Sequence, residues 1–188
     1  MRLKTILLIG GARSGKSLFA QELALRLGGP VLFVATAEAG DEEMKHRIEE
    51  HQRSRPPQWS TLEATTRVGS EIRQKIGGAK VVIVDCITLL VSNILGQHTN
   101  QTDELIDAAL IEKEVTTEIG ELIDCIRQVS ASFIMVTNEV GAGLVPASKL
   151  GRLYRDSLGR ANRILAEQAD EVYLMVAGIP VAIKSTKV

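Results

Sequence analysis

The sequence predicts an α/β fold in which a mostly parallel sheet is flanked by helices and followed by a C-terminal hairpin. Four segments, 4–9, 30–35, 80–85 and 132–137, are short continuous apolar runs, which is the pattern of strands buried on both faces. Segments with helical spacing lie between these runs. Because that alternation is typical of parallel strands joined by crossover helices, it places the chain in the α/β class.

Helical and turn patterns connect these strands in order. Leucine and alanine recur at helical spacing over 16–27, and Gly28-Gly29 ends that helix. A polar helix is predicted from Asp41 to about Arg53, since acidic residues stabilise the positive end of a helix dipole, and Pro56-Pro57 closes it. The remaining predictions are an edge strand at 60–63, helices at 66–76, 87–95, 103–129 (with a break point near Gly120) and 148–170, a polar loop at 96–103, and a hairpin of 172–176 and 181–184 around Gly178-Ile179-Pro180.

The composition fits a single cytoplasmic domain over residues 1–188, with 45% hydrophobic side chains. Twenty-two basic and 23 acidic residues give a net charge of −1, and aromatic residues make up only 3%, so we expect neither nucleic acid nor an anionic membrane as a partner. No apolar run approaches the roughly 20 residues of a membrane span, and no secretory signal precedes the first strand. Cys86 and Cys125 are expected as reduced thiols in or near the core.

The first strand runs directly into Gly10-Gly11-Ala12-Arg13-Ser14-Gly15-Lys16-Ser17 and then into a helix. This is the Gly-x-x-x-x-Gly-Lys-Ser phosphate-binding loop, or P-loop, in the context that the motif requires. Glycines let the backbone wrap closely, so that successive N–H groups point at phosphate oxygens, and the helix N-terminus adds its positive dipole end. We expect Lys16 to reach the β- and γ-phosphates of a nucleoside triphosphate and the Ser17 hydroxyl to ligate Mg²⁺.

Asp85 ends the apolar strand 80–85. An acid at that place corresponds to the Walker-B position, where it holds the Mg²⁺ shell and so offsets the charge that accumulates on a transferring phosphoryl group. A switch-type GTPase would be expected to carry an Asn-Lys-x-Asp signature after a late strand, whereas residues 136–141 read Val-Thr-Asn-Glu-Val-Gly. The loop indicates a nucleotide enzyme without choosing among kinases, ATPases and nucleotidyltransferases.

Several further blocks follow the P-loop in order along the chain. They are Ala35-Thr36-Ala37, Asp41 to Met44, Arg47-Ile48 with His51, Asp85 to Thr88, Thr137 to Pro146, and Arg155-Asp156 with Gly159-Arg160 and Asn162. Together these blocks resemble one family, the bifunctional adenosylcobinamide kinase/adenosylcobinamide-phosphate guanylyltransferases of cobalamin synthesis. The resemblance spans essentially the whole chain and is most specific in the last two blocks.

The resemblance implies a P-loop NTPase fold of the RecA-like kind, a homotrimer and two reactions. In the first, ATP or GTP phosphorylates the aminopropanol hydroxyl of adenosylcobinamide. In the second, GTP donates GMP to adenosylcobinamide phosphate by way of a guanylylated histidine, giving adenosylcobinamide-GDP and pyrophosphate. The motif register places that catalytic histidine at His51.

The chain has three histidines, His46, His51 and His98. His98 lies in a polar loop and is expected to be solvated. His46 and His51 share the predicted polar helix, but five residues of helix turn through about 500°, so their side chains project roughly 140° apart and do not share one site. A neutral imidazole, with an unperturbed pKa of about 6.5, attacks phosphorus without a separate base. Arg47 and Arg55 are candidates to neutralise the α-phosphate.

The resemblance also implies guanine-nucleotide contacts beside that histidine and at strand ends. Glu63 has a physical rationale, because a carboxylate accepts hydrogen bonds from the guanine N1–H and 2-amino group. Asn138-Glu139, at the carboxyl end of a parallel strand, would face the ligand crevice and contact the corrinoid or a phosphate. The implied nucleotide-contact set is Ala35, Thr36, Ala37, Gln52, Arg53, Ser54, Arg55, Glu63 and Asp85.

Three other functions are compatible with a P-loop. A RecA-like ATPase acting on nucleic acid is disfavoured by the neutral charge balance and scarce aromatic residues. A monofunctional small-molecule kinase would transfer the γ-phosphate without forming covalent GMP. A non-catalytic nucleotide-binding subunit is disfavoured because Lys16, Ser17 and Asp85 are all present. The choice between ATP and GTP as phosphate donor stays open at this point.

Overall fold

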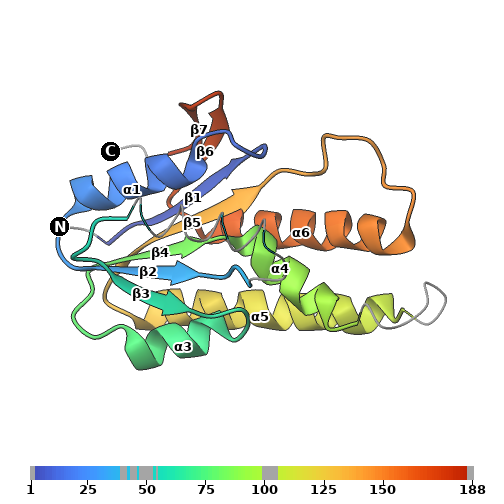
Figure 1. Cartoon of the computed structure of the whole chain (residues 1–188), viewed down its shortest axis with the longest axis horizontal. Coiled ribbons are helices and arrows are strands. Elements are labelled where there is room, and N and C mark those ends of the chain that lie inside the picture. The colour runs from blue at the N-terminus through green and yellow to red at the C-terminus, as the bar shows by residue number, and fades with distance from the viewer. Residues whose placement is uncertain are drawn as a thin grey trace.

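The computed structural model describes residues 3–38, 42, 46, 53, 55–98 and 106–185. Within these residues the strands are β1 (Thr5–Gly10), β2 (Val31–Ala35), β3 (Ser60–Glu63), β4 (Val81–Asp85), β5 (Ser132–Asn138), β6 (Glu171–Val176) and β7 (Ile179–Lys184). They form one sheet in the order β3-β2-β4-β5-β1-β6-β7 (Figure 1). Its described pairings are parallel except that β7 runs antiparallel to β6. The predicted mostly parallel sheet with a C-terminal hairpin is confirmed.

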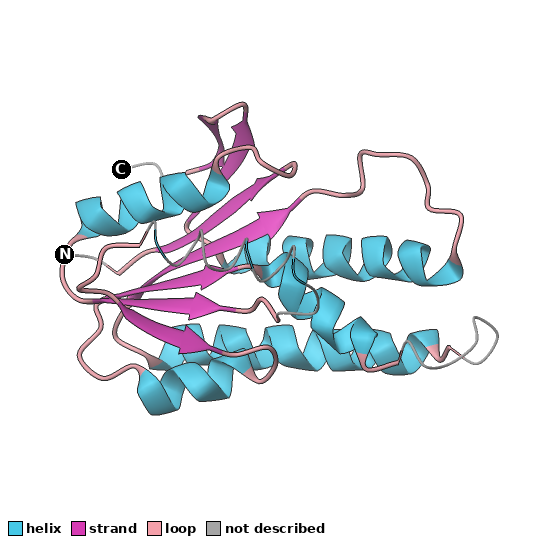
Figure 2. Cartoon of the chain, viewed as in Figure 1, coloured by secondary structure: helices cyan, strands magenta, loops and turns pink. Residues whose placement is uncertain are grey.

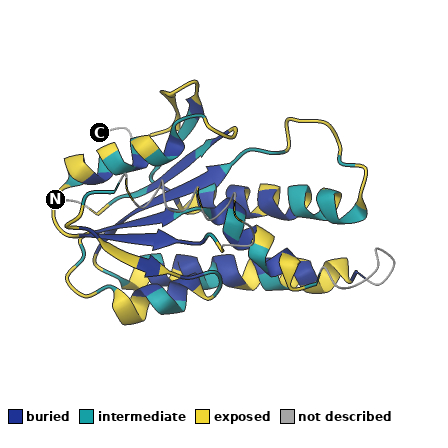
Figure 3. Cartoon of the chain, viewed as in Figure 1, coloured by how far each residue is buried: buried dark blue, intermediate teal, exposed yellow. Residues whose placement is uncertain are grey.

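Helices pack on both faces of this sheet (Figure 2). They are α1 (Lys16–Leu27), α3 (Val68–Lys75), α4 (Ile87–Gly96), α5 (Ala108–Gln128) and α6 (Lys149–Gln168). Successive side chains along each strand point to opposite faces of the sheet. On one face, residues such as Ile6 and Ile83 pack with α1, and on the other face, residues such as Leu7 and Val84 pack with α3 to α6. The middle of the sheet is therefore buried from both sides (Figure 3), which explains its continuous apolar strands.

The long helix predicted at 103–129 differs from the structure at its start and at Gly120. The helix expected at 103–129 begins at Ala108, because the Asp107 side chain accepts hydrogen bonds from the N–H groups of Ala109 and Leu110 and so caps it. It also continues unbroken through Gly120, where a side chain would meet open space.

The hairpin turn was also placed too late in the sequence. It consists of Ala177 and Gly178, with φ of 49° and 82°, while Ile179 and Pro180 already belong to β7. Two successive positive φ values are the geometry of a two-residue hairpin turn. Pro180 is tolerated within β7 because β7 is an edge strand.

Glu118 joins two helices on the α3 to α6 face. Its buried carboxylate, 7% exposed, accepts hydrogen bonds from the N–H groups of Arg67 and Val68, each at 2.8 Å. These are the first donors of α3, whose own N-cap residue provides no side-chain cap. A Cβ on Gly69 would lie 2.4 Å from the Glu121 carbonyl oxygen, so α3 and α5 approach closely just at this cap. Glu118 thus replaces a local cap with one from another helix.

We predict that Glu118→Ala lowers the free energy of unfolding by about 1–3 kcal/mol, because two buried N–H groups lose their acceptor. Urea unfolding measures the loss. The control is Asp124→Ala in the same helix, whose side chain is 62% exposed and pairs only at the surface with Arg127; it should cost less than about 0.5 kcal/mol. Equal losses for the two variants would contradict the capping role.

Candidate functional site

The P-loop lies between the carboxyl end of β1 and the N-terminus of α1, as predicted. Gly15 is the residue before the helix and has a φ of 91°. Gly10 passes so close to β6 that a Cβ would lie 2.5 Å from the Met175 carbonyl oxygen. Glycine is therefore required at Gly15 for its backbone conformation and at Gly10 for close packing.

The Lys16 side chain folds over the loop. Its ammonium donates hydrogen bonds to the carbonyl oxygens of Gly10, at 3.0 Å, and Gly11, at 2.6 Å, and the residue is only 7% exposed. Burial lowers the pKa of Lys16, while the neighbouring Cys86 and Asp85 act in the opposite direction. The ammonium thus lies in a partly desolvated position within electrostatic range of the acid at the end of β4.

Strand register brings two acids to the same edge of the sheet. Ala35, the last residue of β2, lies opposite Glu63 of β3 on one side and Asp85 of β4 on the other. With about 4.8 Å between neighbouring strands, the Cα atoms of Glu63 and Asp85 are roughly 10 Å apart. Ile83, two residues before Asp85, and Phe33, which lies opposite Thr61 two residues before Glu63, pack on the face that carries α1. Because side chains two apart share a face, Asp85 and Glu63 project toward that same side.

Thr36 fixes the end of β4 from within the protein. Its hydroxyl donates to the Cys86 carbonyl oxygen and accepts from the Cys86 N–H, both at 2.7 Å, and its own N–H donates to the Asp85 carbonyl oxygen. Thr36 is fully buried, and the Asn93 amide donates to its carbonyl oxygen. The Thr36 side chain, expected as a nucleotide contact, is thus directed to the Asp85-Cys86 backbone, where it holds the acid in place.

Arg55 extends the site away from the P-loop. Its guanidinium carbon lies 3.8 Å from the centre of the Phe33 ring. Burial lowers the pKa of Arg55, and the charges of Asp85 and Glu63 oppose that effect. Buried Nε and Nη1 atoms of Arg55 have no hydrogen-bond partner among the residues that the structure describes. Stacking on an aromatic ring holds a guanidinium in place while leaving its N–H donors available.

A cavity of about 420 Å³ opens beside Arg55. Its lining residues are Arg55, Pro56, Pro57, Trp59, Thr61 and Glu63. It combines a cation, a carboxylate and an aromatic side chain, and its size falls in the usual range for small-molecule sites. The predicted contacts Arg55 and Glu63 therefore share one cavity. In the sheet, β4 with its terminal Asp85 lies between β3, which carries Glu63, and β1, which leads into the P-loop. The charge of Asp85 acts on both Lys16 and Arg55.

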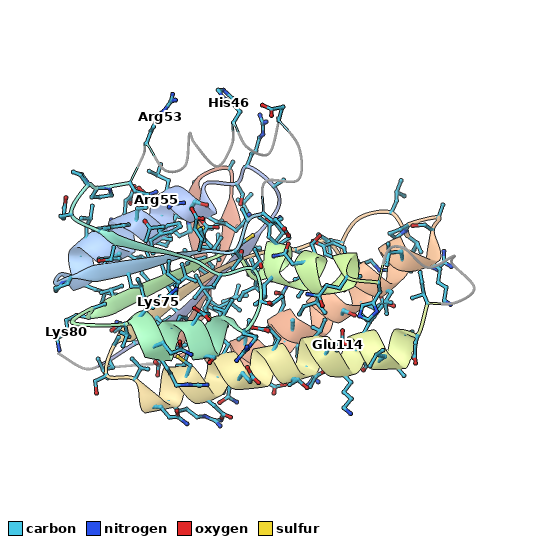
Figure 4. All side chains as sticks on the ribbon, turned by 60° about the horizontal axis from the view of Figure 1, so that its bottom comes forward. His46, Arg53, Arg55, Lys75, Lys80 and Glu114 are labelled. Carbon is cyan, nitrogen blue, oxygen red and sulfur yellow. The ribbon has the colours of Figure 1, made fainter. Side chains whose placement is uncertain are left out.

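The histidines are only partly placed by the structure. His51, Gln52 and Ser54 lie outside the described residues, as does Arg47. His46 and Arg53 are exposed and helical, and Figure 4 shows them projecting away from the body of the molecule, whereas Arg55 lies against it. The solvated His98 was a wrong prediction: its Nε2 lies 2.7 Å from Glu114 Oε2 of α5, and its side chain is 15% exposed.

The carboxyl end of β5 is held by a polar network of Thr88, Thr137 and Asn162, three residues that belong to the ordered sequence blocks but had no individual role there. The Thr137 hydroxyl donates to Asn162 Oδ1 at 2.7 Å, and the Asn162 amide donates to the Asn138 carbonyl oxygen. The Asn138 N–H in turn donates to the Thr88 hydroxyl at 2.7 Å. Thr88 and Asn162 are both buried polar residues on helices. Their polarity within otherwise apolar helix faces was the sequence signal for such a role.

Cys86 and Cys125 are free thiols, Cys125 buried and Cys86 partly so, as predicted. Burial and the nearby Asp85 raise the pKa of Cys86 to about 11. Among described residues, no cluster of three or more His, Cys, Asp or Glu side chains is arranged to hold a metal ion. None of the helices in the described part of the chain has the length and apolar character needed to cross a membrane.

A parallel sheet with a P-loop after its first strand and an acid at the end of β4 defines a nucleotide-binding P-loop protein of the RecA-like class. Solved structures support that fold. The chain aligns over its full length with a protein from Pyrococcus horikoshii OT3, covering 89% of it at a TM-score of 0.56 and 10% identity. It also aligns over 91% of its length with 73% of the RadB recombinase, at a TM-score of 0.50 and 15% identity.

Sequence comparison narrows the class to a family. The model of the cobinamide kinase / cobinamide phosphate guanyltransferase family matches residues 6–183, and the chain belongs to this family. It is 41% identical over 180 residues to the bifunctional adenosylcobalamin biosynthesis protein CobU of Escherichia coli strain K12, covering 95% of this chain and 99% of that one. The corresponding protein CobP of Pseudomonas aeruginosa is 37% identical over 178 residues, covering 95% and 96% of the two chains.

We predict that Thr36→Val lowers the free energy of unfolding by about 1–3 kcal/mol, because the buried Cys86 N–H loses its acceptor. The same change should slow phosphoryl transfer, since Asp85 is no longer held in place. Thr36→Ser is the control, because it keeps the hydroxyl and both hydrogen bonds to Cys86. Urea unfolding and a phosphoryl-transfer assay measure the two effects. If the valine and serine variants behave alike, Thr36 does not fix Asp85 through its hydroxyl.

Proposed function

We propose that this chain phosphorylates adenosylcobinamide and then transfers GMP from GTP to the phosphate formed. One observation carries the proposal within the family match: in the sheet, β4 with its terminal Asp85 lies between the P-loop strand β1 and β3, whose Glu63 lines the cavity with Arg55. A kinase needs only the P-loop with Lys16. A cavity with a cation and a carboxylate beside the triphosphate site gives the second reaction its own recognition elements.

In the kinase reaction, the P-loop residues 10–17 hold the triphosphate of ATP or GTP and Lys16 contacts the β- and γ-phosphates. The acceptor hydroxyl oxygen attacks the γ-phosphorus, the bond to the β-phosphate oxygen breaks, and a nucleoside diphosphate leaves. Asn138-Glu139, at the end of β5, faces the acceptor. The Glu139 N–H donates to the Gly10 carbonyl oxygen at 3.1 Å, which supports this assignment by joining that end to the P-loop.

Mg²⁺ fits the residues at the loop. Mg²⁺ in proteins is usually held by one or two carboxylates together with substrate phosphates, and it does not need a cage of three or more side chains. The Ser17 hydroxyl and the Asp85 carboxylate would hold it. When bound, it supplies positive charge beside the phosphates.

In the transferase reaction, a ring nitrogen of His51 attacks the α-phosphorus of GTP, and pyrophosphate leaves. A phosphate oxygen of adenosylcobinamide phosphate then attacks the same phosphorus, which breaks the P–N bond and regenerates the histidine. Arg55 offers N–H donors to the α-phosphate, and Glu63 accepts from the guanine base. The remaining contacts proposed for the nucleotide are Ala35, Thr36, Ala37, Gln52, Arg53 and Ser54. Thr36 would contribute through its main chain, since its side chain is bonded to Cys86.

We also propose that residues 1–188 act as one P-loop catalytic domain, in the cytoplasm and as a homotrimer. A single sheet that includes strands from Thr5 to Lys184 supports one domain. The monofunctional kinase is the competing function, since it uses the P-loop without the second cavity. An ATPase acting on nucleic acid has less support, because the net charge is −1 and aromatic residues make up 3% of the chain.

We predict that the chain, incubated with Mg²⁺ and GTP labelled at the α-phosphate and then denatured, retains the label. His51→Ala should abolish the label because it removes the attacking nitrogen, whereas His46→Ala should keep it. Acid lability of the retained label would identify a phosphoramidate. Label on neither the wild-type chain nor His46→Ala would contradict the transferase and leave the monofunctional kinase.

We predict that Glu63→Gln weakens the use of GTP in guanylylation by roughly 10- to 100-fold, the usual effect of losing a charged hydrogen-bond acceptor. ATP-driven phosphorylation should change by less than about threefold, since the P-loop is untouched. Inosine triphosphate, which lacks the 2-amino group, provides an internal comparison. The wild-type chain should prefer GTP to it, and Glu63→Gln should lose that preference. An unchanged preference would show that Glu63 does not contact the base.

A further inference from the structure

The last strand of the C-terminal hairpin, β7, contributes little to the core of the protein. All six residues of β7 are exposed (Figure 3), and the apolar side chains of Ile179, Val181 and Ile183 are 65%, 46% and 62% exposed. Burial of apolar surface is the main stabilising contribution to a fold. A strand that buries so little is therefore held in the sheet mainly by its backbone pairing with β6.

The turn of this hairpin contacts the P-loop. The Gly178 N–H donates a hydrogen bond of 3.0 Å to the Ser14 carbonyl oxygen. A Cβ on Gly15 would lie 3.1 Å from the Gly178 Cα, so the two glycines pack directly against each other. Residues 14 and 178 are 164 positions apart, and no local pattern joins them. The contact depends on the positive φ of Ala177 and Gly178, which brings the turn over the loop.

This hydrogen bond fixes the orientation of one peptide group in the loop. The Ser14 carbonyl and the Gly15 N–H belong to the same peptide, and in a planar trans peptide these two groups point in opposite directions. Since the carbonyl is bonded to the hairpin, the Gly15 N–H is directed away from it. The peptide before a glycine would otherwise reorient easily, because glycine has little conformational restriction.

We propose that Gly178 is a positioning residue for the nucleotide: the hairpin turn anchors the Ser14–Gly15 peptide so that its N–H is preset for a phosphate oxygen. The inference rests on the proposed function, in that the P-loop must bind a nucleoside triphosphate. It adds that the phosphate site includes a residue of the last strand pair, far from the loop in sequence. Preorganisation of this kind lowers the cost of ordering a loop on binding.

The test compares variants of the full chain. Gly178→Val forces a β-branched residue into a positive φ and should open the turn, although a Cβ there would meet no neighbouring atom within 4 Å. Gly178→Asn keeps the N–H and tolerates positive φ, so it should preserve the contact. Gly69→Ala is the control for instability, because its Cβ would lie 2.4 Å from the Glu121 carbonyl oxygen, in helix packing away from the loop.

The measurements are the thermal midpoint and the affinity for Mg²⁺ with adenosine β,γ-imidotriphosphate, a non-hydrolysable probe of the P-loop alone. We expect Gly178→Val to bind roughly tenfold more weakly than the wild-type chain, and Gly178→Asn to bind within about threefold of it. Gly69→Ala should lose thermal stability while keeping its affinity. Should Gly178→Val fail to fold, Gly178→Ala carries the same test with a smaller expected loss.

Equal affinity of the wild-type chain and Gly178→Val would overturn this proposal alone. So would a loss of affinity in Gly69→Ala as large as that in Gly178→Val, since the effect would then follow stability and not the turn. Failure of the wild-type chain to bind either this probe or its guanosine counterpart would overturn the proposed function and this proposal together.

Discussion

The parallel register of the sheet is the constraint on which the rest of this protein depends. Because the central strands run in one direction, their carboxyl ends meet at one edge, where Gly10, Glu63 and Asp85 are brought together from segments as much as 75 residues apart. A one-residue slip of β4 would turn Asp85 toward the α3 to α6 face and into the apolar core there. Because successive side chains of a strand point to opposite faces of the sheet, the register that buries the apolar residues also sets which polar residues face the site.

That edge is held by buried polar side chains that come from elsewhere in the fold. Thr36 and Asn93 fix the segment after β2 against Asp85-Cys86, while Thr88 and Asn162 fix the end of β5. A hydrogen bond of this kind contributes only about 1 kcal/mol net, but a buried donor left without its partner costs more. These contacts therefore matter more for the position of the strand ends than for the stability of the fold. They leave the loops that follow the strands little freedom around the phosphate site.

Electrostatics divide the site into two parts around one acid. Lys16 and Arg55 are both partly desolvated cations, and the charge of Asp85 acts on each. In the proposed function, the triphosphate occupies the first part and the guanylyl group is recognised in the second, where Glu63 and the Phe33-supported Arg55 line a cavity. The γ-phosphorus of one nucleoside triphosphate and the α-phosphorus of a second, GTP, are then attacked in separate reactions without a second P-loop.

Local sequence patterns were enough to predict the strands, the P-loop, the acid that ends β4 and the family, because apolar runs, glycine spacing and ordered motifs encode them. Glu63 and Arg55 were predicted from the sequence as nucleotide contacts, but their shared cavity became apparent from the folded chain alone. It also decided that Thr36 faces Cys86, that His98 pairs with Glu114 and that Gly178 bonds to Ser14. The physical reason is the same in each case. The partners in the last three contacts are between 16 and 164 residues apart, so the free energy of each contact depends on packing that no local window of sequence contains.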